Sequence, residues 1–137
     1  MFKSKKGQQM IEFAVVLPVI VFCMGLLVTF GQLIFARMVV QMAAYDGARS
    51  AVVMQSASSG RNAADDRARR ALENAIGMVE GSKQSTFTHT GWSRGGLLTY
   101  SVSIRVRTLF PIINEDFQIG RETLIRGTSV TMVERGG

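Results

Sequence analysis

One uninterrupted apolar segment dominates the N-terminal third of the chain. Residues 13–36 form a run of 24 positions without a charged side chain. A helix rises about 1.5 Å per residue, so this run would reach roughly 36 Å, enough to cross a hydrocarbon core of about 30 Å with some tilt. The pattern therefore predicts a membrane-spanning helix.

The helical pattern continues past the first charge, Arg37. The stretch that follows contains no proline and is rich in Ala, Met, Val and Gln. Its apolar positions share one helical face: Val39, Met42, Ala43, Ala48 and Val52. We expect one continuous helix from Gln8 to about Gln55, kinked at Pro18, where proline removes one backbone hydrogen bond.

A second, amphipathic helix is expected after a small polar linker at residues 56–60. Asn62 is its predicted N-cap and Gly81 its predicted stop. Its apolar stripe consists of Ala64, Ala68, Ala71, Leu72, Ala75 and Val79. Pairs of opposite charge one turn apart are expected on its wet face: Asp65 with Arg69, Asp66 with Arg70, and Arg69 with Glu73.

After residue 81 the period of the pattern changes from helical to alternating. The inward positions are Leu98, Tyr100, Val102, Ile104, Val106, Thr108 and Phe110. They predict a half-buried antiparallel strand that ends at Pro111. Residues 86–92 are expected to pair with it across a turn at 93–96, and residues 123–133 are a further strand candidate. The predicted fold class is α+β: a long transmembrane helix, then one amphipathic helix on a small antiparallel sheet.

The composition argues against several classes of function. The chain is 47% apolar and 19% charged, which is typical of an ordered protein. Its net charge of +6 comes without aromatic interleaving or a nucleic-acid motif, so no nucleic-acid partner is expected. Without metal-ligand spacing or a phosphate-binding loop, we expect no metal, no cofactor and no catalysis. His89 is read as an exposed loop residue, and the single cysteine, Cys23, as a small hydrophobe.

Charges flank the apolar span unequally. Three lysines precede it, whereas Arg37 alone follows closely, so the positive-inside rule predicts a cytoplasmic N-terminus and an exterior C-terminal part. Glu12 stands between the lysines and the span. Glu12 by itself supports two interpretations equally. It is either a hydrated carboxylate at the membrane interface, favoured by the helix N-terminus, or a functional residue.

The spacing around Glu12 resembles a known processing signal. Lys5, Lys6 and Gly7, then four residues and the pair Glu12-Phe13, resemble the class III signal of type IV pilins. The match is closer to the Gly-x-x-x-x-Glu-aromatic motif of the tight-adherence (Flp, type IVc) pilus. Residues 12–18 and 43–49 resemble the opening and the juxtamembrane stretch of the TadE-like proteins of that system.

This resemblance implies how the signal works. A prepilin peptidase of the membrane would cleave the bond between Gly7 and Gln8 on the cytoplasmic face, recognising the two lysines, Glu12 and Phe13. Glu12 would become the fifth mature residue and set subunit register by pairing with a neighbour's α-amine. The first mature residue of type IV pilins is commonly Phe, whereas Gln8 stands here.

The sequence thus predicts a leader (1–7), a transmembrane and juxtamembrane helix (8–55) and a small extracytoplasmic α+β domain (56–137). The resemblance implies a minor pilin or pseudopilin of a bacterial inner membrane that primes or enters a filament. Its partners would be the peptidase, other pilin subunits, an assembly platform and lipid. The alternative is an uncleaved single-pass accessory protein that binds an assembly partner through its exterior domain.

Overall fold

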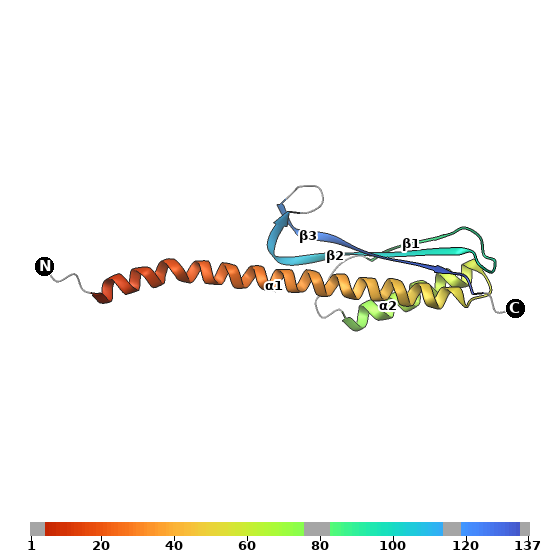
Figure 1. The fold of residues 1–137 in the computed structure, drawn as a ribbon, viewed down its shortest axis with the longest axis horizontal. Coiled ribbons are helices and arrows are strands. Elements are labelled where there is room, and N and C mark those ends of the chain that lie inside the picture. The colour runs from red at the N-terminus through yellow and green to blue at the C-terminus, as the bar shows by residue number, and fades with distance from the viewer. Residues whose placement is uncertain (1–4, 76–82, 114–118, 135–137) are drawn as a thin grey trace.

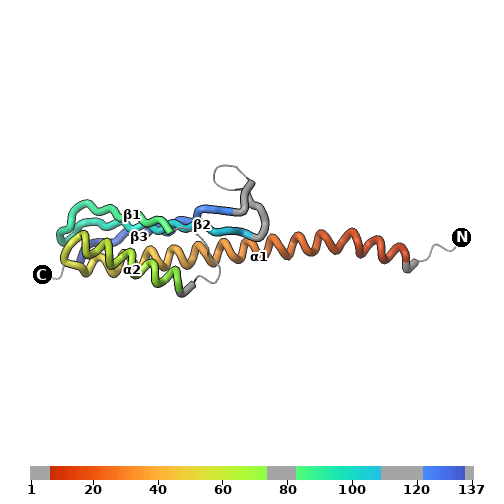
Figure 2. The backbone as a smooth tube through the Cα atoms, turned by 180° about the vertical axis from the view of Figure 1, so that it is seen from behind, coloured from red at the N-terminus to blue at the C-terminus, as the bar shows by residue number. Residues whose placement is uncertain are grey.

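The computed structural model describes residues 5–75, 83–113 and 119–134, with side chains for 7–73, 83–108 and 122–134. The elements are α1 (Lys5–Val52), α2 (Ala57–Ala75), β1 (Gln84–His89), β2 (Leu97–Ile113) and β3 (Ile119–Met132). The N-terminal half of α1 projects alone from a body formed by its C-terminal half, α2 and the sheet (Figures 1 and 2). The predicted α+β fold, with its long apolar N-terminal helix, is confirmed.

The C-terminal half of α1 forms one wall of the core. Its buried residues recur every three or four positions along one face: Ala36, Val40, Ala43, Ala44, Ala48, Ala51 and Val52. Most of them are alanines, so neighbouring elements approach the helix axis closely. The helix ends at Val52, near the predicted end, but Met42 was wrongly placed on the inner face because its side chain is 64% exposed.

The predicted linker at residues 56–60 is wrong, because α2 already begins at Ala57. Ser56 caps this helix: its Oγ accepts a hydrogen bond from the backbone N–H of Ser59 at 3.3 Å. Asn62, the predicted cap, therefore lies inside the helix. The two helices are joined by a tight turn, in which the N–H of Met54 donates to the carbonyl of Ala51 at 3.0 Å.

Gly60 and Gly127 each permit a close approach between different elements of the body. A Cβ at Gly60 would lie 2.6 Å from the ring of Trp92 and 3.2 Å from the carbonyl oxygen of Ala51. A Cβ at Gly127, in β3, would lie 2.6 Å from the carbonyl oxygen of Val40. Glycine is therefore required at both positions for steric reasons, which local sequence pattern did not reveal.

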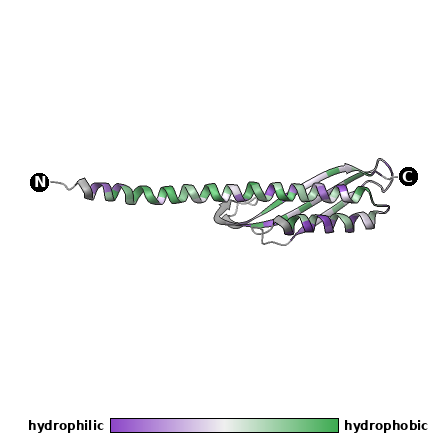
Figure 3. Cartoon of the chain, turned by 90° about the horizontal axis from the view of Figure 1, so that it is seen from below, coloured by the Kyte–Doolittle hydropathy of each residue, from purple (hydrophilic) through white to green (hydrophobic). Residues whose placement is uncertain are grey.

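Helix α2 lies beside α1, and the sheet covers one side of this pair (Figures 1 and 3). The predicted stripe is confirmed for Ala64, Ala68 and Leu72, which are buried, and for the half-buried Ala71. The side chain of Ala75 lies outside the described residues, as do Val79 and the stop predicted at Gly81.

The wet face of α2 carries two of the three predicted ion pairs. Arg70 contacts Asp66 at 2.9 Å, and Arg69 contacts Glu73 at 3.3 Å. The pair predicted between Asp65 and Arg69 is wrong, because Arg69 contacts Asp66 instead, at 3.3 Å. Asp65 flanks the buried stripe and turns toward the sheet.

The sheet is antiparallel in the order β1-β2-β3. The alternation predicted for β2 is confirmed from Leu98 to Thr108, and the side chain of Phe110 lies outside the described residues. The strand does not end at Pro111 but continues to Ile113. The register is irregular between Arg107 and Ile112, so the proline lies where the ladder is interrupted, as prolines in sheets usually do.

The partners of β2 differ from prediction mainly in their bounds. Strand β1 pairs with β2 from Gln84 opposite Ser103 to His89 opposite Leu98. Trp92, which was expected in this strand, lies beyond it, and its indole N–H donates to the carbonyl of Met54 at 3.2 Å. The predicted third strand is confirmed as β3.

Candidate processing and assembly site

The predicted signal lies on the first turns of α1, where Gly7, Gln8, Glu12 and Phe13 are exposed. The side-chain amide of Gln8 donates from Nε2 to Oε1 of Glu12 at 3.4 Å. This contact places the Glu12 carboxylate on the same helical face as residue 8, one turn further along. A carboxylate so placed can accept a hydrogen bond or an ion pair from a donor at the start of the helix.

The bond between Gly7 and Gln8 is helical, because α1 begins at Lys5 rather than at Gln8. A Cβ added at Gly7 would meet nothing within 4 Å, so the backbone there is open from the side. Glycine in a helix costs about 1 kcal/mol relative to alanine, so this turn unwinds easily. Lys5 and Lys6 begin the helix, and their side chains lie outside the described residues.

Between the signal and Arg37, the residues of α1 are mainly hydrophobic (Figure 3). The exposed fractions of Phe13, Leu17 and Leu27 are 64%, 45% and 72%. Within the described residues, α1 is the one helix long and apolar enough to cross a membrane. An uncovered apolar surface of this size is unsuited to water, so this helix is fitted to be a membrane anchor. It continues past Pro18, where the kink stays a prediction.

The described residues contain no group of three His, Cys, Asp or Glu side chains arranged to hold a metal ion. His89 is exposed at the end of β1 rather than in a loop, with ring centroids 6.0 Å from Phe87 and 5.7 Å from Trp92. Cys23 is exposed on α1, within the apolar surface. These groups belong to different surfaces, and the structure does not bring them together.

One buried polar link joins α2 to the sheet. Tyr100 is a buried residue, and its hydroxyl donates to Oδ1 of the half-buried Asp65 at 2.7 Å. Burial, and then this hydrogen bond, raise the pKa of Tyr100 above its ordinary value. Lys83 donates from Nζ to the backbone carbonyl of Asp65 at 2.9 Å, and burial lowers the pKa of Lys83. A neutral phenol on a carboxylate is a structural link rather than a nucleophile.

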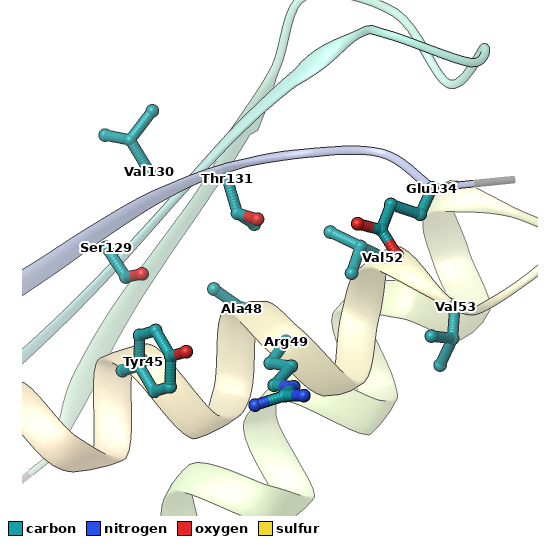
Figure 4. A pocket seen from close by; sticks show the side chains of 9 residues that line it. All are labelled: Tyr45, Ala48, Arg49, Val52, Val53, Ser129, Val130, Thr131 and Glu134. Carbon is teal, nitrogen blue, oxygen red and sulfur yellow. The ribbon is translucent and has the colours of Figure 1, made fainter.

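A groove of about 450 Å³ lies between α1 and the end of β3 (Figure 4). It is lined by Tyr45, Ala48, Arg49, Val52, Val53, Ser129, Val130, Thr131 and Glu134. Arg49 forms no salt bridge with any of the described side chains. Sequence reasoning missed this groove because its two walls lie far apart in the chain. It presents one arginine, one glutamate and apolar side chains to a partner.

The comparison with protein families gives one match. Residues 7–49 match the family model described as TadE-like protein. Over these residues the chain is similar to TadE-like proteins. The resemblance predicted from the sequence is confirmed. Neither the curated proteins nor the solved structures gave a match.

The TadE-like segment coincides with most of α1. It begins at Gly7, on the N-terminal side of the predicted cleavage bond, and ends at Arg49 in the groove wall. It includes Glu12, Phe13 and Pro18, whereas the two lysines of the signal precede it. The TadE-like match therefore covers both the uncovered apolar half of the helix and the half that carries core residues.

Proposed function

We propose that this chain is a minor pilin or pseudopilin of a tight-adherence or type IV pilus-like secretion system. One observation carries the proposal: the TadE-like match coincides with a helix whose membrane-length apolar surface the other described elements leave mostly uncovered. Such a surface can exchange contacts with lipid for contacts with other subunits. The role is structural rather than enzymatic. The additional helix and sheet favour a minor subunit, since the major pilins of this system are mostly one helix.

Processing by a prepilin peptidase is the first step of the proposed pathway. The N-terminus lies in the cytoplasm of a bacterial cell and the sheet lies outside it, as the lysines before the span favour. Cleavage between Gly7 and Gln8 is supported by the exposure of this bond near the start of α1. Cleavage removes the three lysines, and with them the strongest cytoplasmic anchor of the helix.

Glu12 is the proposed register residue of the mature subunit. In the uncleaved chain its carboxylate contacts the neutral amide of Gln8. After cleavage residue 8 carries an α-amine, and a neighbouring subunit presents the same group. A carboxylate drawn into a packed bundle needs such a partner, because an unpaired buried charge typically costs about 3–5 kcal/mol.

The alternative is an accessory protein that keeps its N-terminus. Helix α1 passes through the predicted cleavage bond without a break, which favours this reading. The groove beside Arg49 then supplies an exterior surface for an assembly partner. The two functions differ in whether residues 1–7 remain on the protein.

Assembly is tested by exchanging the Glu12 carboxylate for an amide. The variant Glu12→Gln should insert into the membrane and be cleaved, yet fail to co-purify with a tagged wild-type copy. Glu73→Gln makes the same exchange on the solvent-exposed face of α2, where Glu73 pairs with Arg69, and should co-purify normally. Undiminished recovery of cleaved Glu12→Gln would remove Glu12 from the assembly interface and leave it as an interfacial residue.

A further inference from the structure

The sheet reaches down alongside the span itself. Thr29 lies within the uncharged run, yet it is only 1% exposed. Its hydroxyl donates to the carbonyl of Gly25 at 2.9 Å, which satisfies the group within the helix. Strands β2 and β3 extend back along α1 toward its N-terminal half (Figure 1). One side of the span is therefore covered by protein before the span ends.

This arrangement leaves a short uncovered helix. Thr29 lies 17 residues after Glu12, which is a rise of roughly 25 Å. A bilayer has a hydrocarbon core of about 30 Å. If Glu12 stays at the inner interface, the hydrocarbon core ends about 5 Å beyond Thr29, at a height where the sheet covers one side of the helix.

The opposite side of α1 is apolar at the same height. Leu27, Phe30 and Ile34 share one helical face and are 72%, 59% and 62% exposed. The bilayer can therefore extend past Thr29 on that side without meeting a charge. On the side of α1 that the sheet covers, lipid at the level of Thr29 must therefore face the ends of β2 and β3.

The sequence of these strand ends suits lipid. Residues 109–113 of β2 read Leu-Phe-Pro-Ile-Ile. The backbones of Ile112 and Ile113 pair with Gly120 and Ile119 of β3. Apolar residues on a paired backbone are what the boundary of a bilayer tolerates, whereas unpaired backbone groups are excluded from its core.

We propose that the membrane-proximal strand ends (residues 109–113 and 119–120) enter the outer interface of the bilayer and contact lipid. This inference rests on the proposed membrane anchoring. The uncovered part of α1 is shorter than the hydrocarbon core is thick. The strand ends would contact lipid over the remaining thickness and so fix the depth of α1 in the bilayer. Otherwise the bilayer must thin, or Glu12 must be drawn inward.

The test measures the depth of spin labels in the full chain. Cys23→Ala provides a cysteine-free background, and the protein is placed in phosphatidylcholine vesicles. A nitroxide is attached through Ile112→Cys, through Leu27→Cys on the uncovered face of the span, or through Ser93→Cys in the exposed distal turn. For each label we measure the collision rate with oxygen, which concentrates in lipid, and separately the collision rate with a water-soluble nickel complex.

At Ile112 we expect the ratio of oxygen to nickel collisions to exceed that at Ser93 several-fold and to be lower than that at Leu27. A water-like ratio at Ile112 with a lipid-like ratio at Leu27 would overturn the inference and leave the proposed function intact. Water-like ratios at both sites would overturn the membrane anchoring as well. If Ile112→Cys does not fold, Ile113→Cys labels the next residue of the same strand end, with the same expected ratios.

Discussion

The side chain of Gln41 bonds to both backbone groups of Thr128. Its Nε2 donates to the Thr128 carbonyl at 2.9 Å, and its Oε1 accepts from the Thr128 N–H at 3.3 Å. Because β3 is an outer strand of the sheet, this amide takes the place of a neighbouring strand at that point. Helix α1 is thereby tied to the edge of the sheet, next to the close approach of Gly127 to Val40.

Replacing Gln41 with alanine should loosen this tie. Each hydrogen bond contributes about 0.5–1.5 kcal/mol net, so we expect the loss of both to lower the free energy of unfolding by about 1–3 kcal/mol. Chemical denaturation in detergent micelles measures it. Gln55→Ala is the matched control, since Gln55 is exposed beyond the end of α1. Equal stabilities of the two variants would show that the paired amide contributes nothing.

Gly127→Ala should destabilise the body because its Cβ would meet backbone atoms of α1 at 2.6 Å, and those atoms cannot swing aside. Overpacking of this kind costs about 1–3 kcal/mol. Gly31→Ala, whose Cβ would meet nothing within 4 Å, is the control. Thermal unfolding followed by circular dichroism compares them, and an unchanged transition in Gly127→Ala would contradict the close packing of β3 on α1.

Stability should fall in alkaline solution through Tyr100. Its pKa is raised by folding, so its contribution is complete below the unfolded pKa of about 10 and is lost as the pH rises above that value. Tyr100→Phe should be less stable at pH 8 by about 1.5–3 kcal/mol, because it removes a hydrogen bond to a carboxylate. It should also lose less stability than the wild type between about pH 9 and 11.

The control for this prediction is Tyr45→Phe, since Tyr45 is 55% exposed. That variant should follow the wild-type dependence on pH. Identical slopes for wild type and Tyr100→Phe would show that the buried phenol does not govern the alkaline loss of stability.

Local periodicity was sufficient to predict the elements but not all of their limits. The uncharged run predicted α1, and strict alternation predicted β2, since both patterns follow directly from which face is buried. Gly60 was read as part of a linker because glycine disfavours helices, yet it lies within α2 to admit Trp92. Pro111 was read as a strand end, yet the interrupted register accommodates it.

Contacts across the chain were beyond such reasoning. Asp65 has a plausible partner one turn away, so spacing favoured Arg69, whereas its actual partner is Tyr100 on β2. The groove beside Arg49 could not be predicted from the sequence for the same reason, since its walls come from distant parts of the chain. The domain boundaries stay a prediction, although residues 36–52 of α1 share the core with α2 and the sheet. The roles of Gly7 and Glu12 also stay predictions.

The mass of the mature protein tests the central claim most directly. Co-expression with an active prepilin peptidase should yield a protein that lacks residues 1–7 and begins at Gln8. Gly7→Leu should remain uncut under the same conditions, since a bulky side chain blocks the open backbone at that bond. A wild-type protein that still begins at Met1, or that begins at any residue other than Gln8, would contradict the account.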